Sequence, residues 1–159
     1  GLTQVLGAMR YIAALSVMLL AGCAQSSDSA IAAAVLSSPP HPRLALCLNV
    51  SGADPSPALA AELRRAGRTF TPLSGCSRRG AYVFANGRPA ESVTAECQMV
   101  GLSGAEVTLS SYFSPMAAST WVVALEWRQG RWQLKDQRLQ SISMAPNNSS
   151  KPTPLRGAA

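Results

Sequence analysis

The most apolar stretch of the chain lies near its N-terminus, where residues 11–20 are apolar except for Ser16. Met9 and Arg10 precede this stretch, and small residues follow it. A positive start, a short apolar run and small residues before a cleavage point are the features of a secretory signal. The run is also shorter than the ~20 residues that a membrane-spanning helix needs. The pattern therefore predicts that residues 1–22 form a signal peptide, with Met9 as its true start.

Further along the chain, one segment repeats its apolar residues at helical spacing. Leu59 and Leu63 fall on the same face of this segment, and prolines suit its first turn. Either Asp54 or Ser56 can cap the free amides at its start, and Gly67 supplies a stop at its end. We expect a single helix here.

Most of the remaining sequence has the short apolar or alternating runs that are typical of β-strands. Asn86-Gly87 is a strong signal for a hairpin turn, and Gln129-Gly130 separates two further runs. The sequence therefore predicts an α+β domain over residues 43–144, with one helix packed against a curved, mainly antiparallel sheet. The expected strands cover residues 44–50, 69–73, 81–85, 91–100, 105–113, 120–128 and 132–139.

Two segments outside this domain have the composition of unstructured chain. Residues 23–42 are rich in Ser, Ala and Pro, which predicts a flexible tether with no core of its own. Residues 30–36 within it can form a transient helix. Residues 145–159 are polar and contain three prolines, which predicts a disordered tail.

The four residues Leu20-Ala21-Gly22-Cys23 match the lipobox of bacterial lipoproteins, and here the chain resembles that class. The resemblance covers the signal and the cysteine, not the domain. It implies that signal peptidase II recognises Leu20, Ala21 and Gly22 and cuts before Cys23, whose thiol carries a diacylglycerol. Diacylglycerol supplies the more than one acyl chain that stable anchoring needs. Ala24, where Asp would signal retention, implies the periplasmic face of the outer membrane, with the inner membrane as the alternative.

Three cysteines remain once Cys23 is assigned to the lipid, and an oxidising compartment favours one pair and one leftover. Cys76 falls in a predicted loop and Cys97 in a predicted strand, which favours a Cys76–Cys97 disulfide. Cys47 would then remain as a small buried hydrophobic residue. Pairing of Cys47 with Cys76 is a close alternative. No metal site is expected, because there is no Cys-x-x-Cys motif and His41 lies in the tether.

The residues needed for common catalytic chemistry are scarce. A Ser–His–Asp or Cys–His site needs a histidine on a rigid scaffold, and the single histidine, His41, lies between prolines. Glu96 and Glu106 can face each other across a hairpin, and a carboxylate pair can hydrolyse a glycoside. Solvent-facing strand positions are the simpler interpretation of both. We therefore expect a non-enzymatic protein with no cofactor other than the acyl chains on Cys23.

The charge balance bears on partners rather than on the fold. The 14 Lys and Arg residues exceed the 8 Asp and Glu residues by 6, and removing Arg10 with the signal leaves a net charge of +5. A mild positive charge favours anionic surfaces such as lipid headgroups. Nucleic acid is not an expected partner, because the predicted location is outside the cytoplasm.

Aromatic and basic residues are the candidates for partner binding. Trp121 and Trp127 are six residues apart, so in a strand they share a face, and tryptophan is favoured at interface centres. Arg78 and Arg79 fall in a predicted loop, where they can meet an acidic partner. Core packing for the tryptophans and a solvated loop for the arginines are the simpler alternatives.

These observations predict a lipid-anchored domain that binds a protein partner at the cell envelope. The expected partner is a secretion or envelope-assembly component, or a toxin that the protein neutralises. A domain that binds a small ligand is the alternative. A cell-wall hydrolase that uses Glu96 and Glu106 is a third hypothesis.

Overall fold

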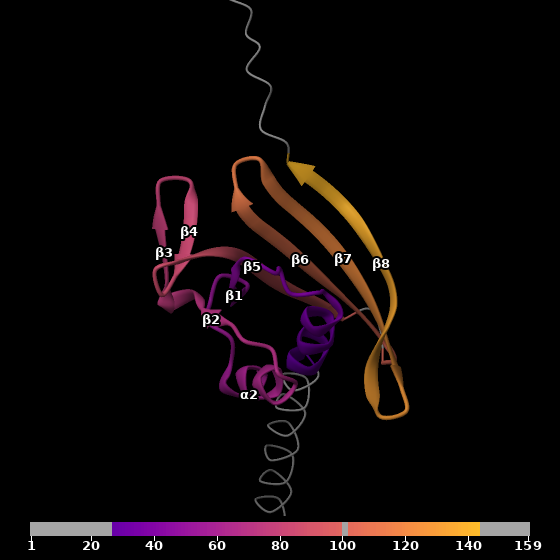
Figure 1. Ribbon diagram of the computed structural model, residues 1–159. Coiled ribbons are helices and arrows are strands. Elements are labelled where there is room, and N and C mark those ends of the chain that lie inside the picture. The colour runs from indigo at the N-terminus through magenta and orange to yellow at the C-terminus, as the bar shows by residue number, and fades with distance from the viewer. Residues whose placement is uncertain (1–26, 100–101, 144–159) are drawn as a thin grey trace, which may run out of the picture.

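The computed structural model describes residues 27–99 and 102–143, which form an open, mixed β-sheet with two helices against one face (Figure 1). The predicted α+β class is confirmed in this coarse form. The prediction of one helix was wrong, because residues 27–37 are also helical. Within the described ranges, no helix has the length and apolar character needed to cross a bilayer. The predicted signal peptide, Cys23 and the tail from residue 145 lie outside the described residues.

The strands are β1 Ala45–Val50, β2 Thr71–Pro72, β3 Cys76–Arg79, β4 Tyr82–Ala85, β5 Arg88–Met99, β6 Gly104–Ser114, β7 Ala117–Arg128 and β8 Arg131–Ser143. Their order across the sheet is β2-β1-β5-β6-β7-β8. β1 pairs in parallel with β2 and β5, whereas the pairings from β5 to β8 are antiparallel. The β3–β4 hairpin joins the sheet through β4, which pairs with β5. A short 3-10 helix, Leu73–Gly75, separates β2 from β3.

Two tight turns join neighbouring antiparallel strands. Asn86 and Gly87 have φ values of 51° and 72° between β4 and β5, which confirms the predicted hairpin. Gln129 and Gly130 have φ values of 54° and 74° between β7 and β8. Two successive positive φ values are the signature of the turn that matches the twist of paired strands.

The predicted helix is α2, Pro57–Arg65, and its local signals behave as expected. The Ser56 hydroxyl caps it by accepting a hydrogen bond from the Leu59 N–H at 3.1 Å. Gly67, with a φ of 81°, takes the left-handed conformation that ends the helix. Leu59 and Leu63 are fully buried, so this face packs into the core.

The helix formed by residues 27–37, here called helix 27–37, overturns the prediction of a flexible tether for that part of the chain. Ala30, Ile31, Ala32, Ala34 and Val35 are all buried in it. Alanine is the best helix former and its small side chain lets the helix approach the sheet closely. Residues first interpreted as linker are therefore a principal layer of the core.

The main core lies between the two helices and the sheet. Side chains that alternate along the strands point to this face, as a strand period of two requires. The buried strand residues in this cluster are Leu48, Ala95, Ala105, Val107, Leu109, Val123, Leu125 and Trp132.

A smaller core lies on the opposite face, under the β3–β4 hairpin. It contains Cys47, Val83, Ala85 and Ala90, and the Cys47–Cys76 disulfide joins β1 to β3 there. The favoured Cys76–Cys97 pairing was therefore wrong, and the close alternative is the pair that forms.

The position of Cys97 explains this outcome. Cys97 packs against the main core on the helix-covered face, so the sheet separates it from Cys76. It is a half-buried free thiol. Burial raises the pKa of this thiol, and a hydrogen bond with Ser27 offsets part of that rise.

Candidate functional site

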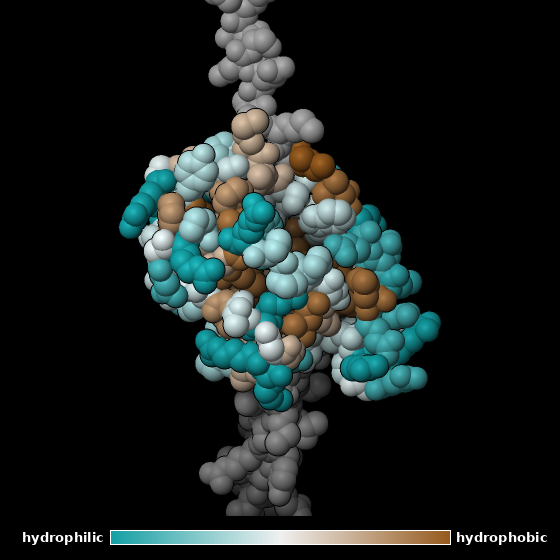
Figure 2. Space-filling view, in the orientation of Figure 1, coloured by the Kyte–Doolittle hydropathy of each residue, from teal (hydrophilic) through white to brown (hydrophobic). Residues whose placement is uncertain are grey.

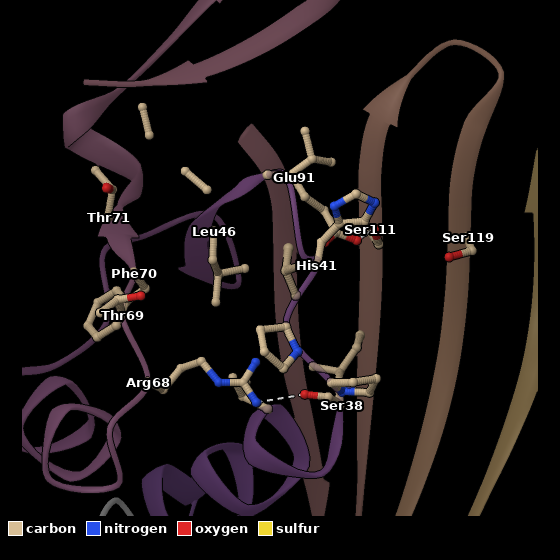
Figure 3. A pocket seen from close by; sticks show the side chains of 18 of the residues that line it. Ser38, His41, Leu46, Arg68, Thr69, Phe70, Thr71, Glu91, Ser111 and Ser119 are labelled. Carbon is tan, nitrogen blue, oxygen red and sulfur yellow. Dashed lines mark hydrogen bonds between the residues drawn. The ribbon is translucent and has the colours of Figure 1, made fainter. Parts of the chain in front are cut away.

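A cleft of about 760 Å³ opens on the helix-covered face of the sheet, at the C-terminal end of helix 27–37 (Figure 3). Residues 38–41 and 44–46 form one wall and residues 68–71 form another. The floor is built from four neighbouring strands, β5 to β8. Its side chains are Glu91, Val93, Leu109, Ser111, Ser119, Trp121 and Gln137.

The cleft exists because the strands are much longer than the helix that covers them. The 12 residues of β7 span about 40 Å, whereas helix 27–37 spans about 16 Å. The helix covers the part of the face around Val107, Val123 and Leu125. Farther along the same strands, Trp121 and Ser119 line the cleft instead.

Polar groups fix the shape of the walls. The Arg68 guanidinium donates a hydrogen bond to the Ser38 carbonyl oxygen at 2.7 Å, which ties the two walls together (Figure 3). His41 Nδ1 accepts a hydrogen bond from the Arg43 N–H at 3.2 Å. The neutral His41 ring therefore carries its proton on Nε2 and can donate from that atom.

On the floor, the Ser111 hydroxyl donates a hydrogen bond to the Glu91 carboxylate. The cleft combines donors on Arg68 and His41, an acceptor on Glu91 and an aromatic surface on Trp121. Such a mixture of apolar walls with a few polar groups is typical of binding sites.

The structure separates the two tryptophans predicted as a patch. Trp121 and Trp127 do share one face of β7, together with buried Val123 and Leu125, as predicted. However, Trp121 lines the cleft, whereas Trp127 lies beside the β7–β8 turn. There it packs edge-to-face on Trp132, with ring centroids 5.2 Å apart.

Arg78 and Arg79 lie in β3 and not in a loop, which corrects the prediction. Arg78 stacks over the Tyr112 ring at 5.0 Å, and Arg79 over the Phe84 ring at 5.3 Å. Arg78 borders a smaller hollow whose other residues are mostly Ser and Thr, on the face of the sheet opposite the helices. The arginines and the tryptophans therefore do not form one surface.

Glu96 and Glu106 are not a facing pair. In the register of β5 and β6, Glu96 lies opposite Thr108 and Glu106 lies opposite Gln98. Glu106 Oε2 is 3.9 Å from Arg138 Nη2, an exposed ion pair on the sheet surface. Glu96 and Glu106 are therefore diagonal neighbours on the same face of the sheet rather than directly opposed.

Sequence reasoning missed most of the cleft. His41 was assigned to a tether, and Phe70 and Glu91 were assigned only to strands. Glu91 shares a strand face with Val93 and Ala95, and this alternation is a sequence signal that could have placed Glu91 on the inward face.

The cleft continues into exposed apolar side chains on β8. Leu139 lies opposite Trp121, and Ile142 lies opposite Ser119, so both are on the cleft face. Leu139 is 41% exposed and Ile142 is 56% exposed. Figure 2 shows separate hydrophobic patches on this side of the molecule, with hydrophilic side chains between them.

β8 is also an edge of the sheet in the part of the chain that the structure describes. Its pairing with β7 shifts register twice, which leaves Lys135 and Gln140 unpaired in the ladder. Between these irregularities, residues 136–139 keep a regular ladder. An edge of this kind offers backbone groups to a further strand.

No family model, curated protein or solved structure matches this chain.

Proposed function

We propose that this chain is a lipid-anchored, non-enzymatic protein of the bacterial envelope whose cleft binds an extended segment of a protein partner. The observation that carries the proposal is the continuation of the cleft into Leu139 and Ile142. A small molecule would fill the cleft alone, whereas an extended peptide is long enough to cover this apolar row as well.

The chemistry of the surface suits a peptide. Trp121 and Phe70 offer aromatic contacts to apolar side chains, and aromatic residues dominate binding energy at interfaces. Arg68 and His41 can donate to backbone carbonyls or acidic side chains, and Glu91 can accept. The adjacent β8 edge allows the partner to add a strand, a common mode of peptide recognition. The partner classes remain a secretion or envelope-assembly component, or a neutralised toxin.

The anchor is supported by the lipobox and is tested by the intact mass of the protein recovered from membranes. We expect a mature chain that begins at Cys23 and carries acyl mass, and we expect Cys23→Ala to lack that mass. Cys97→Ala is the matched control and should keep it. An unprocessed, unlipidated wild-type chain would contradict the anchor. Recovery with the outer or the inner membrane fraction decides between the two locations.

The cleft is tested by placing a photo-crosslinking amino acid at Leu139 in the living bacterium. Tyr82, on β4 and away from the cleft, is the matched control because it is 51% exposed, against 41% for Leu139. We expect a discrete protein adduct from Leu139 only, and we expect Trp121→Ala to remove it. The same adduct from both positions, or no adduct from Leu139, would contradict the proposal.

A small ligand is the second candidate, because a volume of about 760 Å³ lies in the range of small-molecule pockets. In that case, native mass spectrometry of the protein purified from cells shows an added mass. The added mass would disappear in Trp121→Ala and persist in Tyr82→Ala.

A further inference from the structure

Helix 27–37 fixes how far the domain can be from a lipid on Cys23. Three residues separate Cys23 from Ser27, so the chain between their Cα atoms spans at most about 14 Å. From Ala30 onward the helix is buried in the core, so it cannot swing relative to the sheet. If Cys23 carries the lipid, the end of the domain that contains Ser27 must face the bilayer.

The hairpins β5–β6 and β7–β8 turn at this same end of the domain. Ser27 hydrogen bonds Cys97 near the end of β5, and the β5–β6 turn lies beyond Cys97. The Trp127 N–H donates to the Ser103 carbonyl oxygen at 2.8 Å, which joins that turn to the end of β7. Figure 1 shows the β7–β8 turn at the same end as the start of the indigo helix.

The side chains at these turns have the composition of a membrane-contacting surface. Leu102 is fully exposed, and Trp127 is exposed beside it in the register of the hairpins. Arg128 and Arg131 are exposed on the two sides of the β7–β8 turn. Arg128 forms an ion pair with Glu126 at 3.0 Å, so Arg131 is the principal cation of this surface. Tryptophan favours the membrane interface, and basic residues near an anionic lipid surface are attracted to it.

We propose that the membrane-facing tips, which are the side chains of Leu102, Trp127, Arg128 and Arg131, contact the surface of a bilayer that contains anionic lipid. This inference rests on the proposed lipid anchor and adds the orientation of the domain. The cleft lies at the opposite end of helix 27–37, about 16 Å farther from the lipid. The domain is therefore held close to the membrane with its cleft turned away from it and open to a partner.

The test uses the full lipidated protein in vesicles of phosphatidylethanolamine with a minority of phosphatidylglycerol. An environment-sensitive fluorophore is attached to Leu102→Cys, and in parallel to Met116→Cys, in a Cys97→Ser background. Met116 is the matched control because it is an exposed apolar residue in the turn between β6 and β7, at the far end of these strands. A nitroxide on the lipid headgroups then quenches fluorophores that lie near the bilayer.

We expect quenching at Leu102 to be several-fold stronger than at Met116, and Arg131→Cys to behave like Leu102→Cys. Equal quenching at all three positions, in protein that floats with the vesicles, would overturn the orientation and leave the anchor intact. Protein that does not float with the vesicles lacks the anchor, and the orientation falls with it. Vesicles of phosphatidylcholine alone should weaken quenching at Leu102 if the arginines meet anionic headgroups.

Discussion

Replacing Ile31 by Asn is expected to lower the free energy of unfolding by about 5 kcal/mol. Removing a buried isoleucine side chain costs about 2–5 kcal/mol, and a buried amide without partners adds about 1–3 kcal/mol. Ile31 is 2% exposed in the main core. Since domains are stable by only about 5–15 kcal/mol, this single change should leave much of the protein unfolded.

The control is Leu36→Asn, which makes a similar change one and a half turns along the same helix. Leu36 is 36% exposed, so we expect this change to lower the free energy of unfolding by about 1 kcal/mol or less. Urea unfolding of the full chain in mild detergent, followed by circular dichroism, measures both values. If both variants lost the same small amount of unfolding free energy, residues 27–37 would be the flexible tether that their composition indicates.

The parts of the fold that were predictable are those specified by local chemistry. The capping hydroxyl of Ser56, the stop at Gly67 and the Asn86-Gly87 turn each act on neighbouring backbone. Such signals do not depend on the rest of the molecule, so α2 and the β4–β5 hairpin follow from them. The strand period of two likewise predicted correctly that Trp121 and Trp127 share one face of β7.

Helix 27–37 was not predictable in the same way. Three of its five buried positions are alanines, and alanine is also common in linkers. Its burial is decided by a sheet whose strands come later in the chain, which is a tertiary effect on a weak local preference. Calling this segment a tether also placed His41 in a mobile region and removed it from the candidate site.

The cleft itself depends on how much of the sheet the helices leave uncovered. Its residues come from many separate segments between Val35 and Gln137, and no local sequence pattern shows where the helices stop covering the sheet. The same limit applies to the cysteines. Sequence placed Cys76 and Cys97 in a loop and a strand, but the face of the sheet, which decides the pairing, requires the assembled fold.

The disulfide is expected to have the second large effect on stability. Cys47 and Cys76 are 29 residues apart, and closing a loop of that length in the unfolded chain is worth about 3–4 kcal/mol. We expect Cys76→Ala to lower the free energy of unfolding by that amount. Cys97→Ala removes only a half-buried sulfur, so we expect it to lower the free energy of unfolding by about 1 kcal/mol.

Unfolding with and without reductant then identifies the pair. Reductant should lower the free energy of unfolding of wild type and of Cys97→Ala by about 3–4 kcal/mol. It should leave the free energy of unfolding of Cys76→Ala unchanged. Because burial raises the pKa of Cys97, its thiol stays protonated at neutral pH and is a poor nucleophile for exchange with the disulfide. Loss of the reductant effect in Cys97→Ala, and its persistence in Cys47→Ala, would instead establish the Cys76–Cys97 pairing and require the β3–β4 hairpin to pack on the other face.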